Sequence, residues 1–218
     1  MQQALACQQR GRLAEAERLY REMLAEAPGY FDAWNMLGVV HYLQHQYLAA
    51  AECFEKAISI DPGIAAAHLH LGLPLQRLRR YEEALATYDR ALALRRDYPE
   101  ALLNRGNALL DLGRPAESLA SYDRALALRR DHPEALFNRG NALQSLKRHA
   151  DALTSYDQAL AIKPDFPEAL VNRGNALEDL DRVEEALASY DRALAQRPDY
   201  TRALHNRGSA LVWPWPRS

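Results

Sequence analysis

The sequence predicts an all-α protein, an α-solenoid in which antiparallel pairs of helices follow one another. Glycines recur at a constant interval of 34 residues: Gly38, Gly72, Gly106, Gly140, Gly174 and Gly208. An aromatic stripe has the same period: Phe54, Tyr88, Tyr122, Tyr156 and Tyr190. An alanine stripe lies one helical turn further on: Ala57, Ala91, Ala125, Ala159 and Ala193. A fixed period of about 34 residues is the length of one helix–turn–helix unit.

The period divides the chain into repeats. Five complete units are expected at 31–64, 65–98, 99–132, 133–166 and 167–200. A partial unit precedes them at 1–30, in which 12–28 has the pattern of a second helix. The helix of a truncated sixth unit is expected at 201–212, followed by a tail outside the repeat at 213–218.

Prolines and turn residues mark the ends of the expected helices. Turns are indicated at Asp61-Pro62-Gly63, Lys163-Pro164-Asp165 and Arg197-Pro198-Asp199. Pro99, Pro133 and Pro167 suit the first turn of a helix, where the missing N–H is not needed. Pro74 falls inside a first helix, and its ring clashes with the carbonyl four residues back, so the pattern predicts a bent helix in unit 65–98.

The recurring glycine lies inside each first helix, where it costs roughly 1 kcal/mol relative to alanine. A column of small residues in the second helix offers a reason: Ala50, Ala84, Ser118, Ala152 and Ala186. We expect these small residues to let the two backbones approach closely. The aromatic and alanine stripes have the helical spacing of a buried face and are expected to form the core, not a cofactor site.

Within the first complete unit, Trp34, Leu37, Gly38, Ala50, Phe54 and Pro62 resemble the tetratricopeptide repeat (TPR) pattern. The resemblance covers nearly the whole chain. It implies a right-handed TPR superhelix that acts as a scaffold and presents a concave groove to a protein or peptide. It does not identify the partner.

Asparagines form two columns on the first helices, three residues apart and therefore on one face. The columns contain Asn104, Asn138, Asn172 and Asn206, and Asn107, Asn141 and Asn175. They resemble the asparagine ladder of O-GlcNAc transferase repeats, in which such amides grip the backbone of an extended peptide. Asparagine is also common at these positions in ordinary TPR sequences, so both interpretations stay open. Leu103, Phe137 and Gln144 are expected beside the asparagines in the groove wall.

The charges on this face predict the kind of partner. Chaperone-binding TPR domains hold an acidic C-terminus with lysine and arginine, but here the corresponding columns contain Leu103, Phe137 and Val171, and Glu100, Glu134 and Glu168. A neutral or basic extended segment is therefore the expected ligand.

An arginine column begins only in the third complete unit, because Leu37 and Leu71 hold the same position earlier. Each arginine follows an aspartate by 16 residues: Asp89 and Arg105, Asp123 and Arg139, Asp157 and Arg173, Asp191 and Arg207. Since a guanidinium in an apolar seam needs a partner, we predict ion pairs between neighbouring repeats. Contacts from these arginines to a ligand are the alternative.

Several classes of function are not indicated. A net charge of −2 gives no basic stripe for nucleic acid. No stretch has the length of a signal peptide or a membrane span, so a soluble cytoplasmic protein is expected. Cys7, Cys53 and the seven histidines form no metal or nucleophile motif. The sequence predicts no enzyme, no cofactor, and no catalytic or metal-binding residue.

Two alternatives to a free-standing scaffold remain. The repeats are similar to those of bacterial glycosyltransferases of the O-GlcNAc transferase or SPINDLY type, so the chain could be the substrate-recognition arm of a larger enzyme. Uncapped ends would also permit self-association. The tail Trp213-Pro214-Trp215-Pro216 stands where the repeat has a turn. A one-base shift of reading frame can encode Gly-Leu-Gly-Arg there, which is the repeat's own turn, and the hypothesis is that such a shift, natural or in the cloned gene, ended the array.

Overall fold

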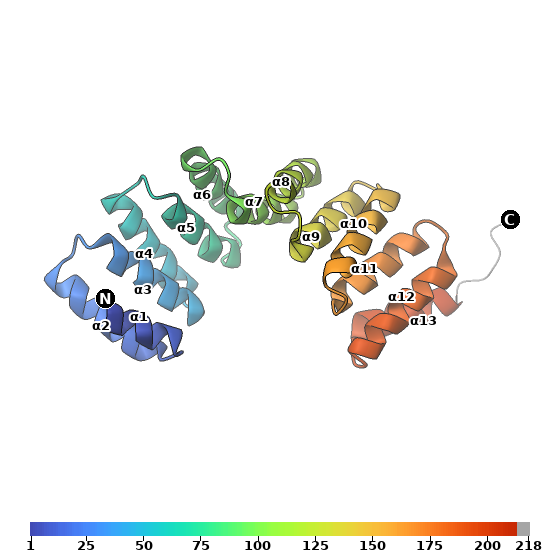
Figure 1. Ribbon diagram of the computed structural model, residues 1–218, viewed down its shortest axis with the longest axis horizontal. Helices are drawn as coiled ribbons and strands as arrows, with labels where there is room; N and C mark the ends of the chain where they lie inside the picture. The colour runs from blue at the N-terminus through green and yellow to red at the C-terminus, as the bar shows by residue number, and fades with distance from the viewer. Residues whose placement is uncertain (213–218) are drawn as a thin grey trace. The chain divides into compact units, whose positions relative to one another are not determined.

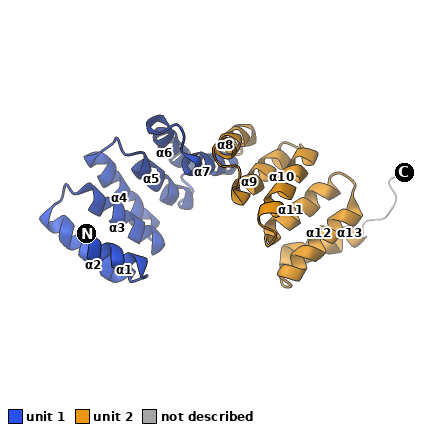
Figure 2. Ribbon diagram, in the orientation of Figure 1, with its two compact units in different colours: residues 1–112 blue, residues 113–218 orange. Residues whose placement is uncertain are grey.

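The computed structural model describes residues 1–212, and within them the chain forms thirteen α-helices and no strand. Figure 1 shows the helices in chain order, each drawn beside its sequence neighbours. The chain divides into two compact units, residues 1–112 and 113–218 (Figure 2). The predicted tail at 213–218, with its expected frameshift and its two tryptophans, lies outside the described residues.

The first compact unit contains seven helices: α1 (Gln2–Gln9), α2 (Leu13–Glu26), α3 (Phe31–Leu43), α4 (Tyr47–Ile60), α5 (Ala65–Arg77), α6 (Tyr81–Leu94) and α7 (Pro99–Asp111). Helices adjacent in sequence pack against one another throughout the unit. We call the odd-numbered helices first helices and the even-numbered ones second helices. In this unit α7 is a first helix that follows α6.

The second compact unit contains six helices: α8 (Pro115–Leu128), α9 (Pro133–Ser145), α10 (His149–Ile162), α11 (Pro167–Glu178), α12 (Val183–Gln196) and α13 (Thr201–Val212). Consecutive helices again pack together, and the first helix α11 also contacts α9 and α13. The all-α class and the helix-pair architecture predicted from the period are therefore confirmed.

The glycine column makes room for the aromatic stripe. An ideal Cβ added to Gly140 would lie 2.4 Å from the ring of Tyr156, and one added to Gly174 would lie 2.3 Å from the ring of Tyr190. Gly38 stands in the same relation to Phe54, at 2.7 Å. The small residues of the second helix are buried as expected, but the first atoms that a new side chain would meet belong to the ring. The ring contact therefore explains the glycines better than close approach of backbones.

The turns from first to second helices contain a second periodic feature, which sequence reasoning missed. Gly11, His45, Arg79, Gly113, Lys147 and Asp181 all have positive φ, between 57° and 73°. These positions are again 34 residues apart. Residues with a Cβ adopt this left-handed conformation at a cost of roughly 1 kcal/mol or more, and only two of the six are glycine. The residue types at this position therefore did not predict the left-handed turn.

The interior proline does not end its helix. Helix α5 runs through Pro74, which is buried, and the carbonyl of Pro74 accepts a hydrogen bond of 2.9 Å from the backbone N–H of Leu78. The bend expected at Pro74 stays a prediction. The prolines expected at helix starts occupy the first position of α7, α9 and α11.

Candidate functional site

The two asparagine columns lie on first helices. Asn104 and Asn107 belong to α7, whereas Asn138 and Asn141 belong to α9, Asn172 and Asn175 to α11, and Asn206 to α13. Asn172 is buried, and the other six are partly exposed. Their contacts differ along the columns and between the two compact units.

In the second unit, Asn141 links two repeats. Its Oδ1 accepts a hydrogen bond from the hydroxyl of Tyr156 at 2.8 Å and another from Nδ2 of Asn172 at 2.7 Å. An amide oxygen has two lone pairs, so both are occupied. The oxygen of Asn172 in turn accepts from the guanidinium of Arg202. The amide of Asn141 is therefore held with its oxygen toward the protein.

The same arrangement recurs one repeat later. Oδ1 of Asn175 accepts from the hydroxyl of Tyr190 at 2.8 Å and from Nδ2 of Asn206 at 2.7 Å. Within residues 1–212, Nδ2 of Asn141 and Nδ2 of Asn175 have no acceptor, and neither atom is buried. The two amides thus present N–H donors to solvent from a fixed position.

Burial keeps the tyrosine hydroxyls in their donating form. Burial raises the pKa of Tyr156 well above its ordinary value. The pKa of Tyr190 is also raised well above its ordinary value, mainly by burial and to a smaller extent by the hydrogen bond to Glu178. The hydroxyl of Tyr156 also lies 3.0 Å from Oε1 of Gln144, whose Nε2 donates to Asp179 at 3.3 Å. Gln144, expected in the groove wall, is therefore part of the tyrosine network.

In the first unit, the asparagine column that contains Asn104 has other hydrogen-bond partners. Nδ2 of Asn104 donates to the carbonyl of Glu100 at 2.9 Å, so it is used within its own helix. One repeat earlier the column contains His70, whose Nδ1 lies 2.9 Å from Oδ1 of Asn35. Burial lowers the pKa of His70.

The two apolar residues expected in the groove wall are partly buried. The ring of Phe137 lies 4.9 Å from the ring of Phe166 and 6.0 Å from that of Tyr156, measured between centroids. Phe137 therefore packs against the edge of the core. Leu103 lies on α7, in the turn before Asn104 and Asn107.

The predicted ion pairs between neighbouring repeats are confirmed. Nε of Arg105 lies 2.6 Å from Asp89, and the same 2.6 Å separates Arg139 from Asp123 and Arg173 from Asp157. Arg207 pairs with Asp191 in the same way. In the second unit a further bond reaches the following helix, because Nη1 of Arg139 donates to Ser155 and Nη1 of Arg173 donates to Ser189, each at 2.6 Å.

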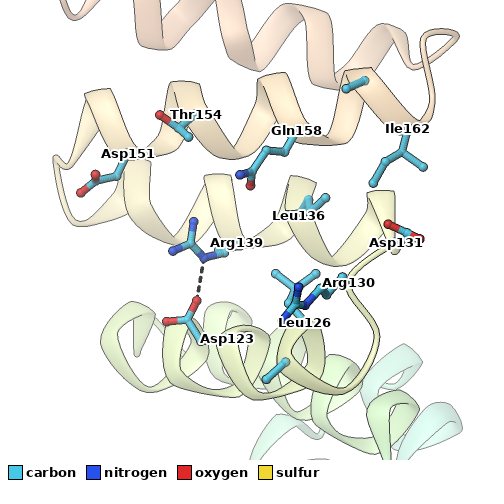
Figure 3. Close-up of a pocket in the computed structure, with 12 residues that line it drawn as sticks. Asp123, Leu126, Arg130, Asp131, Leu136, Arg139, Asp151, Thr154, Gln158 and Ile162 are labelled. Atoms are coloured by element: carbon cyan, nitrogen blue, oxygen red, sulfur yellow. Dashed lines mark hydrogen bonds and ion pairs between the residues drawn. The ribbon is translucent and has the colours of Figure 1, made fainter.

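Of these arginines, Arg139 lines a hollow on the second-helix side of the second unit (Figure 3). Its volume is about 680 Å³, and α8 and α10 form its walls over α9. Figure 3 shows Arg139 directed toward Asp123, with Asp151, Thr154 and Gln158 on the helix opposite. No residue of the asparagine columns lines it. A hollow at matching positions between α2 and α4 includes Arg21, Leu37 and Cys53, so this feature belongs to the repeat and was not predicted.

Cations partly neutralise the acidic column of first helices in the second unit. Glu134 lies 3.6 Å from Nζ of Lys163, and Glu168 lies 2.9 Å from Arg197. In α13 the column changes to Arg202, which bonds to Asn172. The face is therefore less acidic than the column of glutamates alone suggests.

Among residues 1–212, no three histidine, cysteine, aspartate or glutamate side chains gather closely enough to hold a metal ion. Burial raises the pKa of Cys53 to about 11, so its thiol stays protonated. Within the same range, no helix has the combined length and apolar character needed to cross a bilayer.

The chain is similar to solved solenoids over most of its length. The match to pilF of Pseudomonas aeruginosa covers 95% of each chain, at 21% identity and a TM-score of 0.82. For the pilus biogenesis factor PilW the coverage is 94% of each chain, with 21% identity and a TM-score of 0.85. YrrB, described as a TPR protein with an unusual peptide-binding site, is matched over 97% of its length at 22% identity with a TM-score of 0.72. These likenesses establish the fold.

The sequence itself matches models of the repeat. Human superkiller complex protein 3 is 29% identical over 70 residues, which are 32% of this chain and only 4% of that relative. Tetratricopeptide repeat models match residues 103–167, 137–201 and 171–211, as well as 31–64 and 1–40, and a further TPR model matches 79–113. Such repeats are in general non-enzymatic scaffolds for protein–protein interaction. The chain belongs to the tetratricopeptide repeat family.

Proposed function

We propose that the protein is a binding scaffold that holds an extended partner segment in the groove lined by the first helices α9, α11 and α13. The observation that carries this proposal is the fixed orientation of Asn141 and Asn175. Their oxygens bond inward to Tyr156 and Tyr190, and their Nδ2 groups face solvent. Two side-chain donors one repeat apart are suited to binding backbone carbonyls, which every peptide offers.

Binding to donors that are already ordered requires little loss of conformational entropy. A free asparagine must lose rotamer freedom when it binds, whereas these two amides are already ordered by the tyrosine and asparagine contacts. Because backbone carbonyls are common to all sequences, the asparagines supply affinity, and neighbouring side chains supply selectivity. The glutamate column favours a neutral or basic segment. Lys163 and Arg197 weaken this preference, because they pair with two of the glutamates.

This role needs no catalytic residue, metal or cofactor. It also fits a recognition arm of a larger glycosyltransferase, since such an arm would use the same face. The resemblance to O-GlcNAc transferase repeats stays a prediction. The sequence downstream of the chain in its gene would distinguish the two settings, since the second requires a glycosyltransferase region.

The test starts from peptides selected by phage display against the immobilised chain. We expect the double variant Asn141→Asp and Asn175→Asp to weaken a neutral selected peptide by about tenfold or more, because each change replaces a donor with a negative acceptor. Aspartate still accepts from Tyr156 and Tyr190, so helicity and melting temperature should change little. Affinity is measured by isothermal titration calorimetry.

The control is Asn104→Asp, in the neighbouring asparagine column, whose Nδ2 already donates to the carbonyl of Glu100. Affinity should stay close to that of the unmodified chain. Unchanged affinity in the double variant, or an equal loss in the control, would show that the asparagine donors do not hold the peptide.

A further inference from the structure

In the first unit, the turn between α3 and α4 lies against the C-terminal end of α5 through an aromatic contact. The rings of Tyr42 and Tyr47 lie 5.6 Å apart between centroids. The guanidinium carbon of Arg77 lies 5.2 Å from the centroid of the Tyr47 ring, and Nδ1 of His45 lies 2.9 Å from the Tyr47 hydroxyl. Tyr47 is therefore held in place by groups from both turns. We use the name turn surface for five residues: Leu43, Tyr47, Leu48, Arg77 and Arg79.

The two leucines of the turn surface are exposed to solvent. Leu43 is 48% exposed and Leu48 is 60% exposed. The same positions of the other repeats hold charged, polar or small residues: Arg77, Asp111, Ser145 and Asp179 for the first, and Glu82, Ala116, Ala150 and Glu184 for the second. The repeat therefore folds without leucine at either position, and packing within the repeat does not explain these two.

Neighbouring repeats do not cover the leucines. Helix α3 packs against α2 of the preceding repeat, and α4 packs against α5 of the following one. Repeats are thus present on both sides, and Leu43 and Leu48 are still exposed. Further repeats at either end of the array would leave this surface open in the same way, so a continuation of the solenoid is not what covers it.

The two arginines of the turn surface have no carboxylate partner within residues 1–212. Arg77 lies over the ring of Tyr47. Nε of Arg79 donates to the hydroxyl of Tyr81 at 3.3 Å. A guanidinium binds a carboxylate through two parallel hydrogen bonds, and it can do so while it stacks on an aromatic ring. The turn surface therefore offers two cations to acidic groups and two leucines to an apolar side chain.

We propose that the turn surface binds an extended acidic segment of a partner protein, in which aspartate or glutamate alternates with leucine or another large apolar residue. The carboxylates pair with Arg77 and Arg79, and an apolar side chain packs against Leu48 and Tyr47. Arginine and tyrosine are the residue types that most often dominate the binding energy of protein interfaces. This surface belongs to the first unit and takes a ligand of opposite charge to that proposed for the asparagine groove.

An anionic lipid surface is the less suitable ligand for the same cations. Glu82 and Glu83 are both exposed in the first turn of α6, directly after the turn that contains Arg79. Their carboxylates would repel a flat anionic membrane, whereas a narrow segment need not contact them. The charge pattern therefore favours an acidic peptide.

The probe is a fluorescein-labelled synthetic peptide in which aspartate and leucine alternate between flanking serines. Titrated with the full chain in fluorescence anisotropy, it should bind saturably, and added salt should weaken binding because exposed charge pairs are screened. Peptides with lysine or serine in place of aspartate should bind at least about tenfold more weakly, because like charges repel and neutral residues lose the ion pairs.

The double variant Arg77→Gln and Arg79→Gln should weaken the aspartate peptide by about tenfold or more, because both charge-assisted hydrogen bonds are lost. The matched control is Arg90→Gln with Arg95→Gln, which removes the same charge from exposed positions on α6 and at its C-terminal end. The control should leave affinity unchanged. Melting temperatures should stay near that of the parent chain, because all four side chains are exposed.

A second variant tests the apolar part without changing the charge. Leu43→Ser with Leu48→Ser should also weaken the peptide, whereas Asn141→Asp with Asn175→Asp should leave its affinity unchanged. The proposal is overturned if the parent chain does not bind the aspartate peptide, if the two pairs of arginine substitutions have equal effects, or if the leucine variant binds as well as the parent. Binding to phosphatidylserine vesicles without binding to the peptide would overturn it in favour of a lipid surface.

Discussion

One position of the repeat is apolar in the repeat of α3 and α4 and charged in the repeat of α9 and α10. In α3 the position holds Leu37, which is buried beside Cys53 and Arg21. In α9 it holds Arg139, whose charge is met by Asp123 on one side and Ser155 on the other. The repeat tolerates either an apolar side chain or a charge whose partners lie on both flanking helices. The charged solution requires three matched residues, and the apolar one requires a single leucine.

A similar contrast separates Phe54 from Tyr156. Both rings lie over a column glycine. Only Tyr156 has a hydroxyl, which reaches Asn141 and Gln144 and so ties the core to the asparagine face. The later repeats therefore connect core packing to the proposed binding surface through tyrosine, whereas the repeat of Phe54 does not.

The largest effect is expected from removing the ring. Tyr156→Ala should lower the free energy of unfolding by roughly 3–5 kcal/mol, as for other large aromatic truncations in a core. Tyr156→Phe restores the chemistry of the Phe54 repeat and should cost only about 1 kcal/mol, the value of a lost hydrogen bond. Urea unfolding followed by circular dichroism measures both. Equal losses would mean that the hydroxyl, not the ring, dominates.

Transplanting the charge into the apolar repeat should also be costly. Leu37→Arg places a guanidinium opposite Arg21, where α8 has Asp123, and should destabilise by about 3 kcal/mol because the buried charge lacks its partner. Adding Arg21→Asp and Cys53→Ser supplies the two missing partners and should recover most of the loss in the same urea experiment. Failure of the triple variant to recover stability would show that the three residues do not form an independent unit.

The period predicted most of the fold because each column has a simple cause. Aromatic, alanine and glycine positions are set by packing, and the Asp–Arg pairs were visible because Leu37 and Leu71 lack the aspartate. The left-handed turn column was not predicted, since only Gly11 and Gly113 among its six residues are glycine. The inward orientation of Asn141 also escaped prediction, because it depends on where the Tyr156 hydroxyl ends. The second-helix hollow depends on side chains from three helices and has no local pattern.

The turn column allows a smaller, stabilising test. Lys147→Gly should raise the free energy of unfolding by about 1 kcal/mol, because glycine adopts φ near 57° without the steric penalty of a side chain. Gly113→Ala, at the same column, should lower it by a similar amount. Thermal melts of the two variants against the parent give the sign. A loss of stability in Lys147→Gly would mean that the lysine side chain outweighs the backbone strain.

The smallest effect is a pH dependence contributed by His70. Burial lowers the pKa of His70 below its ordinary value of 6.5, so the unfolded chain takes up this proton more readily than the folded chain. The contribution of His70 is fully present above about pH 6.5 and declines as the pH falls below it. His70→Gln should flatten the profile of unfolding free energy between pH 7 and pH 5 (roughly the range of an ordinary histidine). An unchanged profile would contradict a buried, neutral His70.

The most direct measurement follows the side-chain amide protons of the asparagines by NMR while a selected peptide is added. We expect the Nδ2 resonances of Asn141 and Asn175 to shift and to exchange more slowly with water, because new acceptors bind them. Asn104, whose donor bonds to Glu100, should change little. Shifts confined to Thr154, Gln158 and Arg130 around the second-helix hollow, with Asn141 and Asn175 unaffected, would contradict the account and place the peptide on the other side of the repeats.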